Sequence, residues 1–87
     1  MTVWERAPEV VWRRSGVRRL VVGPASDEVV VMEGSGQLIW DLLEHPISEG
    51  DLVATLSDAF DESADQLRPD VLAFLTELSS AGLVTAR

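Results

Sequence analysis

The sequence contains no cysteine, no lysine and no tyrosine, and its only histidine is His45. Without cysteine the chain forms neither disulfides nor thiolate metal sites, and it lacks the nucleophile of cysteine enzymes. One histidine is too few for a histidine zinc site, and we interpret His45 as a solvated residue at a helix end. The glycines never fall into the spacing of a phosphate-binding loop. We therefore expect a protein that is not an enzyme and that holds no metal or other cofactor.

Long apolar segments are absent as well. No run approaches the ~20 residues that a membrane-spanning helix needs, and residues 1–6 lack the apolar core of a secretory signal. We expect a cytoplasmic protein with no membrane partner. The 87 residues are expected to form a single domain over residues 1–87. A domain of this size hides only about 60–65% of its unfolded surface, so its core is thin.

Positive charge is scarce and unevenly placed. Fifteen acidic residues against seven arginines give a net charge of −8. Residues 1–23 carry five arginines and two glutamates, whereas residues 24–87 carry two arginines and thirteen acids. This balance argues against nucleic acid or an anionic membrane as the main partner, because both require a basic surface.

Two charged groups have competing interpretations. One expected turn is flanked by Arg13, Arg14, Arg18 and Arg19. These arginines either form a solvated hairpin tip or grip an acidic partner. A second group consists of Asp58, Asp61, Glu62 and Asp65. The spacing of these acids does not match a calcium-binding loop, so we assign them to helix ends and solubility.

Residues 10–33 are rich in valine and carry turn signals, which predicts three short strands. The strands are expected over residues 10–14, 17–22 and 28–32, separated by a turn at Ser15-Gly16 and a loop at 23–27. Connections this short demand an antiparallel meander. The third strand is apolar on both faces. One face can serve the core, and the other must meet a helix or a partner.

Residues 35–81 repeat their apolar side chains at helical spacing, which predicts three helices. Ser35 is expected to cap the first helix and Pro46 to stop it. Ser48 opens a capping-box variant for the second helix. The apolar face of that helix is expected to hold Leu52, Val53, Leu56, Ala59 and Phe60.

The third helix is expected to begin within about two residues of Gln66, with Pro69 in its first turn. Its apolar stripe consists of Leu67, Val71, Phe74, Leu75, Leu78 and Ala81. Gly82 is expected as the left-handed residue of a Schellman motif, with Leu83 touching Leu78.

A meander followed by helices predicts an α+β fold. We expect a small winged-helix-like domain, with a three-stranded antiparallel sheet followed by three helices. The sheet alone is too small to bury its own face, so it must pack on the helices. Trp40 is expected at the edge of the core. Trp4 precedes every expected element, and it either folds back onto the body or contacts a partner.

The third strand is the most informative feature. If the sheet order follows the chain, Glu28–Met32 is an edge strand that is almost entirely valine. Such edges invite another strand, because their N–H and C=O groups are unpaired. A homodimer or a covered edge would explain it, and so would addition of an extended peptide as a further strand. The sequence leaves these alternatives open.

Three segments together resemble a known family. Residues 33–43 are similar to its pattern small-small-x-hydrophobic-Ile-Trp-x-Leu-Leu, and residues 47–52 to its hydrophobic-Ser/Thr-x-x-Glu-Leu step. Residues 70–84 resemble its ending, Asp-Val-x-x-Phe-Leu-x-x-Leu followed by Gly-Leu-hydrophobic. This is the PqqD family, also called the RiPP recognition element, and the likeness covers roughly residues 8–84. It implies the same winged-helix-like fold of three strands and three helices.

The resemblance also implies a function. Such domains bind the leader part of a ribosomally made precursor peptide and present it to a modifying enzyme, such as a radical SAM enzyme, a cyclodehydratase or a leader peptidase. The leader adds to the third strand and lies against the third helix. Carried onto this chain, the implied peptide-binding residues are Glu28, Val29, Val30, Val31 and Met32 on the strand, and Leu67, Asp70, Val71, Phe74 and Glu77 on the helix.

Two other functions are compatible with the same pattern. One is a winged-helix DNA-binding regulator, which the topology permits and the charge opposes, since the last helix carries only Arg68 against several acids. The other is a structural subunit that forms a homodimer through the open edge.

Overall fold

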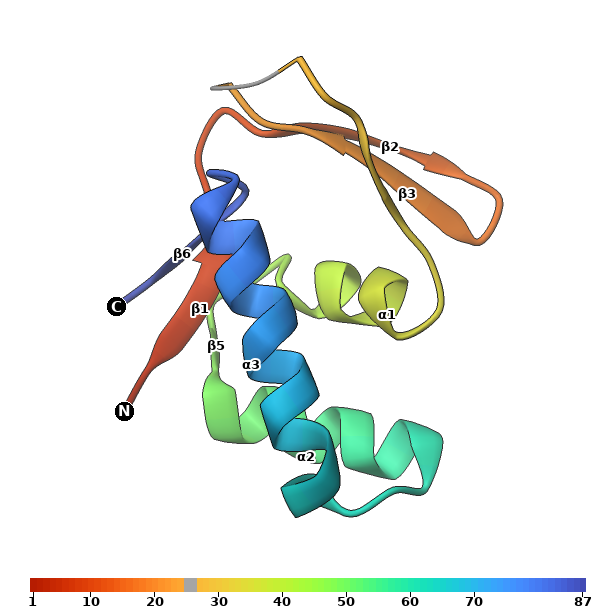
Figure 1. Ribbon diagram of the computed structural model, residues 1–87, viewed down its shortest axis with the longest axis vertical. Coiled ribbons are helices and arrows are strands. Elements are labelled where there is room, and N and C mark those ends of the chain that lie inside the picture. Colours follow the sequence, from red (N-terminus) through yellow and green to blue (C-terminus); the bar gives the residue numbers. More distant parts are fainter. Residues whose placement is uncertain (25–26) are drawn as a thin grey trace.

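The computed structural model describes residues 1–24 and 27–87, and it confirms the α+β class. Within these residues the chain forms three helices and six short strands (Figure 1). The helices are α1 (Ser35–Leu42), α2 (Glu49–Phe60) and α3 (Ala64–Ser80). The strands are β1 (Val3–Arg6), β2 (Val11–Ser15), β3 (Arg18–Val22), β4 (Val30–Met32), β5 (Ile47–Ser48) and β6 (Val84–Ala86). Part of the expected 23–27 loop, residues 25 and 26, lies outside the described residues.

The expected antiparallel meander is present as a sheet in the order β2-β3-β4. Its hairpin pairs Ser15 with Arg18, so the two turn residues are Gly16 and Val17, one position later than expected. Gly16 has φ 62, a conformation that glycine adopts without steric cost. The third strand is shorter than expected, because β4 begins at Val30 and its register with β3 covers Val30–Met32.

A second sheet, in the order β5-β1-β6, was not expected from the sequence. The N-terminal strand pairs antiparallel with the C-terminal strand, Glu5 facing Thr85, and with the two-residue strand before α2. Backbone hydrogen bonds join Val3 and Arg87 in both directions, at 2.8 and 2.9 Å. Trp4 therefore folds back onto the body, where it is buried. This sheet ties both ends of the chain to the start of α2.

The helix boundaries follow local chemistry, with two corrections. Ser35 does not cap α1, because the chain turns one residue earlier at Gly34, which has φ 61. Ser48 caps α2 as expected, and its hydroxyl accepts a hydrogen bond from the Asp51 N–H at 3.1 Å. α3 begins at Ala64, so Pro69 is its sixth residue and lies beyond the first turn. Proline has no N–H, so the helix lacks its bond to the carbonyl four residues earlier.

The end of α3 forms the expected Schellman motif. The Leu83 N–H donates to the Leu78 carbonyl at 2.9 Å, and the Gly82 N–H donates to the Ser79 carbonyl at 3.0 Å. Gly82 has φ 77, as the motif requires. The motif turns the chain from α3 directly into β6.

The core lies where the two sheets and the three helices meet. Trp40 is fully buried at its centre, so the expectation that it lies at the core edge is wrong. The buried residues of the core come from every helix and from both sheets, and include Trp4, Val21, Met32, Leu52, Leu75 and Leu83. Of the face expected on α2, Leu52, Val53 and Leu56 are buried, whereas Ala59 and Phe60 are exposed.

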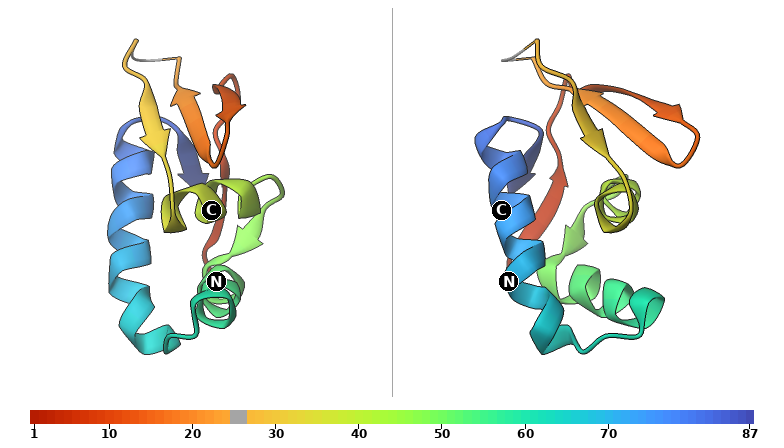
Figure 2. Two further views of the ribbon diagram at one scale, coloured as in Figure 1. Left: turned by 90° about the vertical axis from the view of Figure 1, so that its right-hand side faces the viewer. Right: turned by 45° about the vertical axis from the view of Figure 1, so that its right-hand side comes forward.

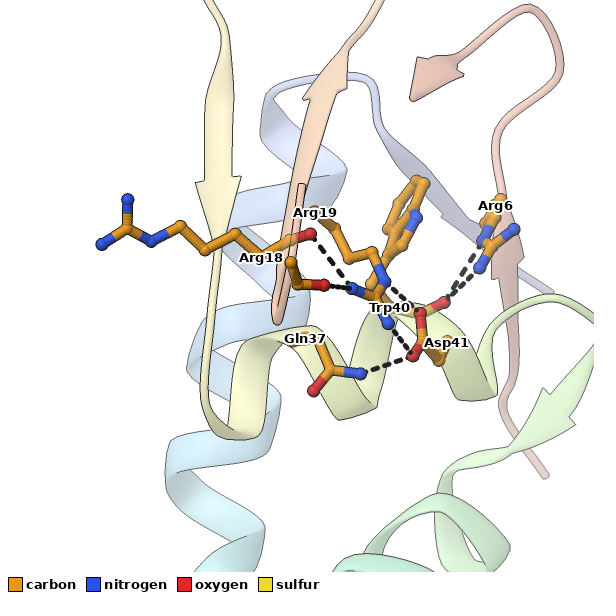
Figure 3. A network of polar contacts seen from close by, with 7 residues as sticks. Arg6, Arg18, Arg19, Gln37, Trp40 and Asp41 are labelled. Carbon is orange, nitrogen blue, oxygen red and sulfur yellow. Dashed lines mark hydrogen bonds and ion pairs between the residues drawn. The ribbon is translucent and has the colours of Figure 1, made fainter. Parts of the chain in front are cut away.

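A polar network fixes the meander on α1 (Figure 3). Arg19 is buried, and its guanidinium donates to both carboxylate oxygens of Asp41 at 3.0 Å. Burial raises the pKa of Asp41, but the hydrogen bonds from Arg19 and Gln37 outweigh it, so this pKa lies below its ordinary value. Arg19 is therefore not part of a solvated hairpin tip.

Arg6 connects the terminal sheet to the same region. Its guanidinium donates to the Trp40 carbonyl at 2.7 Å and lies 4.5 Å from the Trp40 ring centroid and 4.8 Å from that of Trp12. Burial lowers the pKa of Arg6, although nearby Glu44 and Asp41 act in the opposite direction. This cation–π contact holds β1, β2 and α1 together.

Candidate functional site

The first feature of the site is the outer edge of β4. The strand order places β4 at the edge of its sheet, and Figure 2 (left) shows it on the side nearest α3. Val31 is 51% exposed, Val30 is half-buried and Met32 lies in the core. Only one edge of β4 is paired with another strand among the described residues.

The second feature is a groove of about 560 Å³ that begins where β4 ends. It is bounded by the start of α1, the end of α2 and the first half of α3. Its lining consists of Glu33, Ser35, Gly36, Ile39, Leu56, Phe60, Glu62, Leu67, Asp70, Val71 and Phe74. We call this set the groove. It is predominantly apolar, and its volume lies in the range of sites that hold ligands.

The structure brings together part of the residue set expected from the sequence. Four of the five expected helix residues line the groove, namely Leu67, Asp70, Val71 and Phe74. Glu77 is exposed one turn further along α3 and does not line it. None of the expected strand residues 28–32 lines the groove either, but Glu33, which follows β4 directly, does. Strand edge and groove are therefore neighbouring surfaces and not a single cleft.

Sequence reasoning missed seven of the eleven groove residues, including Ile39, Leu56, Phe60 and Glu62. Phe60 was expected on the packed face of α2, but it is 43% exposed. The missing signal is the length of the helix: Phe60 is the last residue of α2, and the left-handed Asp61, with φ 51, follows it. At the end of α2, Phe60 lies in the lining of the groove and not in the buried core.

A small residue lets α1 approach α3 beside the groove. A Cβ atom added to Gly36 would lie 3.2 Å from Cζ of Phe74, closer than ordinary van der Waals contact. Gly36 therefore leaves room for the Phe74 ring. This contact sets the width of the groove at its α1 side.

The charges in the groove have one sign. Glu33, Glu62 and Asp70 line it, and no basic residue does so. Glu33 is paired with Arg18 at 2.9 Å, with both side chains largely exposed. Arg68, the basic residue of α3, is directed to Glu49 at 3.7 Å. The groove is therefore an apolar surface with an acidic rim.

The outer face of the meander carries a second hollow of about 500 Å³, lined by Val11, Trp12, Arg13, Leu20, Val22 and Val29. The sequence required a helix or a partner on this face. In Figure 1 no helix of the described chain covers it.

A family model described as coenzyme PQQ synthesis protein D matches residues 18–84. The chain belongs to the PqqD family. Comparison with curated proteins and with solved structures gives no significant match. The resemblance noted in the sequence is therefore confirmed at the level of the family.

The PqqD match includes every residue of the groove and the whole of β4, and it leaves out β1 and β2. Membership of the PqqD family assigns the chain to the accessory proteins of peptide-derived cofactor and natural-product biosynthesis. Among the described residues there is no group of three or more potential metal ligands, and no helix is long and apolar enough to cross a membrane.

Proposed function

We propose that this chain is a non-catalytic chaperone for a precursor peptide. It binds the leader of a ribosomally synthesised peptide by strand addition and delivers it to a modifying enzyme. The observation that supports this most is the open edge of β4, which ends at an apolar groove beside α3. Val31, the exposed valine of this three-residue edge strand, is not part of the core.

The open edge of β4 and the groove contribute to recognition in different ways. Backbone groups along Val30–Met32 provide hydrogen bonds that depend little on the peptide sequence. Side-chain pockets provide selectivity, and here the pockets lie in the groove against Val71 and Phe74. A leader that occupies both is held in an extended conformation.

Delivery requires no catalytic group on the chaperone. A leader held on β4 raises the effective concentration of the attached core peptide at an enzyme that also binds the chaperone. The enzyme is a radical SAM enzyme, a cyclodehydratase or a leader peptidase. The bare outer face of the meander, with Val11 and Val29 exposed, is available for that second contact.

The test is an amide NMR titration with the leader encoded by a precursor-like reading frame beside this gene. We expect shifts at residues 30–33 and along α3 from 67 to 74. Two variants sharpen the result, Val30→Pro and Val31→Pro. Neighbouring residues of a strand direct their N–H groups to opposite sides, so one of these prolines removes an outward N–H and the other a bond to β3.

The proline that faces outward is expected to leave the domain folded and to weaken leader binding at least tenfold. The other proline variant is expected to destabilise the meander, because it loses a hydrogen bond to β3. It therefore serves as the matched control. Unchanged leader affinity in both variants, each checked for folding, would exclude strand addition. A folded domain with no shifts from the leader at all would contradict the chaperone function for that peptide, and the titration would then be repeated with the neighbouring enzyme.

A further inference from the structure

The geometry points to the class of leader that this chain accepts. We infer that the groove binds a cationic, apolar segment, in which a large aliphatic or aromatic side chain is flanked by arginine or lysine. This inference rests on the proposed function, because it describes what the same site selects.

The buried floor and the partly exposed walls of the groove indicate that part of the ligand is apolar. Ile39, Leu56 and Val71 are buried and form the floor. Phe60 and Phe74 stand at the walls with part of their rings exposed. A water-exposed phenylalanine in a hollow is stabilised when an apolar side chain covers it. The volume of about 560 Å³ has room for more than one large side chain.

The carboxylates at the rim of the groove indicate that another part of the ligand is cationic. Glu62 and Asp70 carry carboxylates that have no ion-pair partner among the described residues. The nearest arginine along the chain, Arg68, is paired with Glu49 and does not line the groove. An acidic segment would bring like charges together, which opposes binding, whereas a basic segment complements the rim.

Continuity with β4 determines where these residues lie in the leader. Glu33 follows Met32 and already lines the groove, so a peptide paired along β4 runs into it. If the added strand is antiparallel to β4, the groove receives residues on the N-terminal side of the paired segment. If it is parallel, the groove receives residues on the C-terminal side.

The experiment selects binders from a library of random 14-residue peptides, displayed on their own messenger RNA, against the full 87-residue chain at low salt. We expect enriched sequences to carry arginine or lysine at a fixed distance from leucine, isoleucine, phenylalanine or tryptophan. Enrichment of acidic or uncharged sequences would overturn the inference. If such peptides still shift the amides of β4, the proposed function stands without it. Failure to enrich any peptide would overturn both.

Variants separate the groove from the general negative charge of the chain. For one enriched peptide, Glu62→Gln and Asp70→Asn are each expected to raise Kd about 2–5-fold, the range of an exposed ion pair. Asp58→Asn makes the same change in net charge at an exposed position of α2 outside the groove, and it is expected to leave Kd unchanged. An equal loss in all three variants would overturn the assignment to the groove.

Discussion

At the scale of single residues, burial separates two arginines that are adjacent in sequence. Arg18 and Glu33 form a pair whose side chains are both about 60% exposed. Arg19 and Asp41 form a pair in which the arginine is 7% exposed and the carboxylate 32%. An exposed pair contributes little to stability, whereas loss of a partner from a buried charge is costly. The Arg19–Asp41 pair is therefore the one that fixes β3 on α1.

Asp41→Asn is expected to lower the free energy of unfolding by about 1–3 kcal/mol at neutral pH, the usual effect of a hydrogen bond to a charged group. The pKa of Asp41 is lowered in the folded state, so its contribution is present above the ordinary carboxyl pKa of ~3.9 and is lost as pH falls through the folded value. The difference in the free energy of unfolding between Asp41→Asn and the original chain should be constant above about pH 5 and should shrink below it. Urea denaturation as a function of pH measures this, with Glu33→Gln as the control that changes stability by less than about 1 kcal/mol.

Phe60→Ala separates binding from folding. The side chain is 43% exposed and lines the groove, so its loss is expected to change the free energy of unfolding by less than about 1 kcal/mol. Leader affinity is expected to fall about 5–30-fold, as for other aromatic residues at the centre of a contact. Isothermal titration calorimetry together with thermal denaturation measures both. Loss of stability with unchanged affinity would show that Phe60 is a core residue and not part of a binding surface.

At the scale of elements, the strands near each other in sequence were predictable and the strands at the ends of the chain were not. The β2–β3 hairpin has a glycine turn and strands rich in valine, and both signals are local. β1, β5 and β6 have two to four residues each and pair over separations of forty residues or more. Strands this short carry no usable periodicity, so their pairing became visible only in the fold.

Trp4 tests whether the terminal sheet belongs to the cooperative core. Trp4→Ala is expected to lower the free energy of unfolding by about 3–5 kcal/mol, because it opens a cavity under β1. Trp4→Phe is expected to cost less than half of this, since it keeps much of the apolar contact. It also removes an indole N–H that is buried without an acceptor among the described residues. Thr85→Ala, at an exposed position of β6 facing Glu5, is the control. Equal stability of all three variants would mean that β1 is frayed in solution.

At the scale of the whole molecule, charge distinguishes the remaining functions. The net charge is −8, and the arginines are concentrated in the first 23 residues. On α3, Asp70 and Glu77 are exposed, and Arg68 is paired with Glu49. A helix with this charge opposes the phosphate backbone and suits a cationic peptide.

We therefore expect no retention of the protein on a 20-base-pair duplex of random sequence at 50 mM salt. Electrophoretic mobility shift measures this, and a basic winged-helix domain run beside it shows that the assay detects binding. A retained complex that dissociates steeply as salt rises would instead favour the DNA-binding alternative, because release of counterions produces that dependence.

Local chemistry let the sequence alone determine the meander, the Ser48 cap of α2 and the Gly82 stop of α3. Each depends on residues within a few positions of one another. The family was also visible in the sequence, because its motifs lie in these same segments. The tertiary structure alone decided that Trp40 is central and that Arg19 is buried. It also decided that Phe60 is exposed at a groove with an acidic rim. These features depend on contacts among residues far apart in the chain. Hydrophobic periodicity indicates which face of an element is buried, but it does not indicate which other element packs against that face.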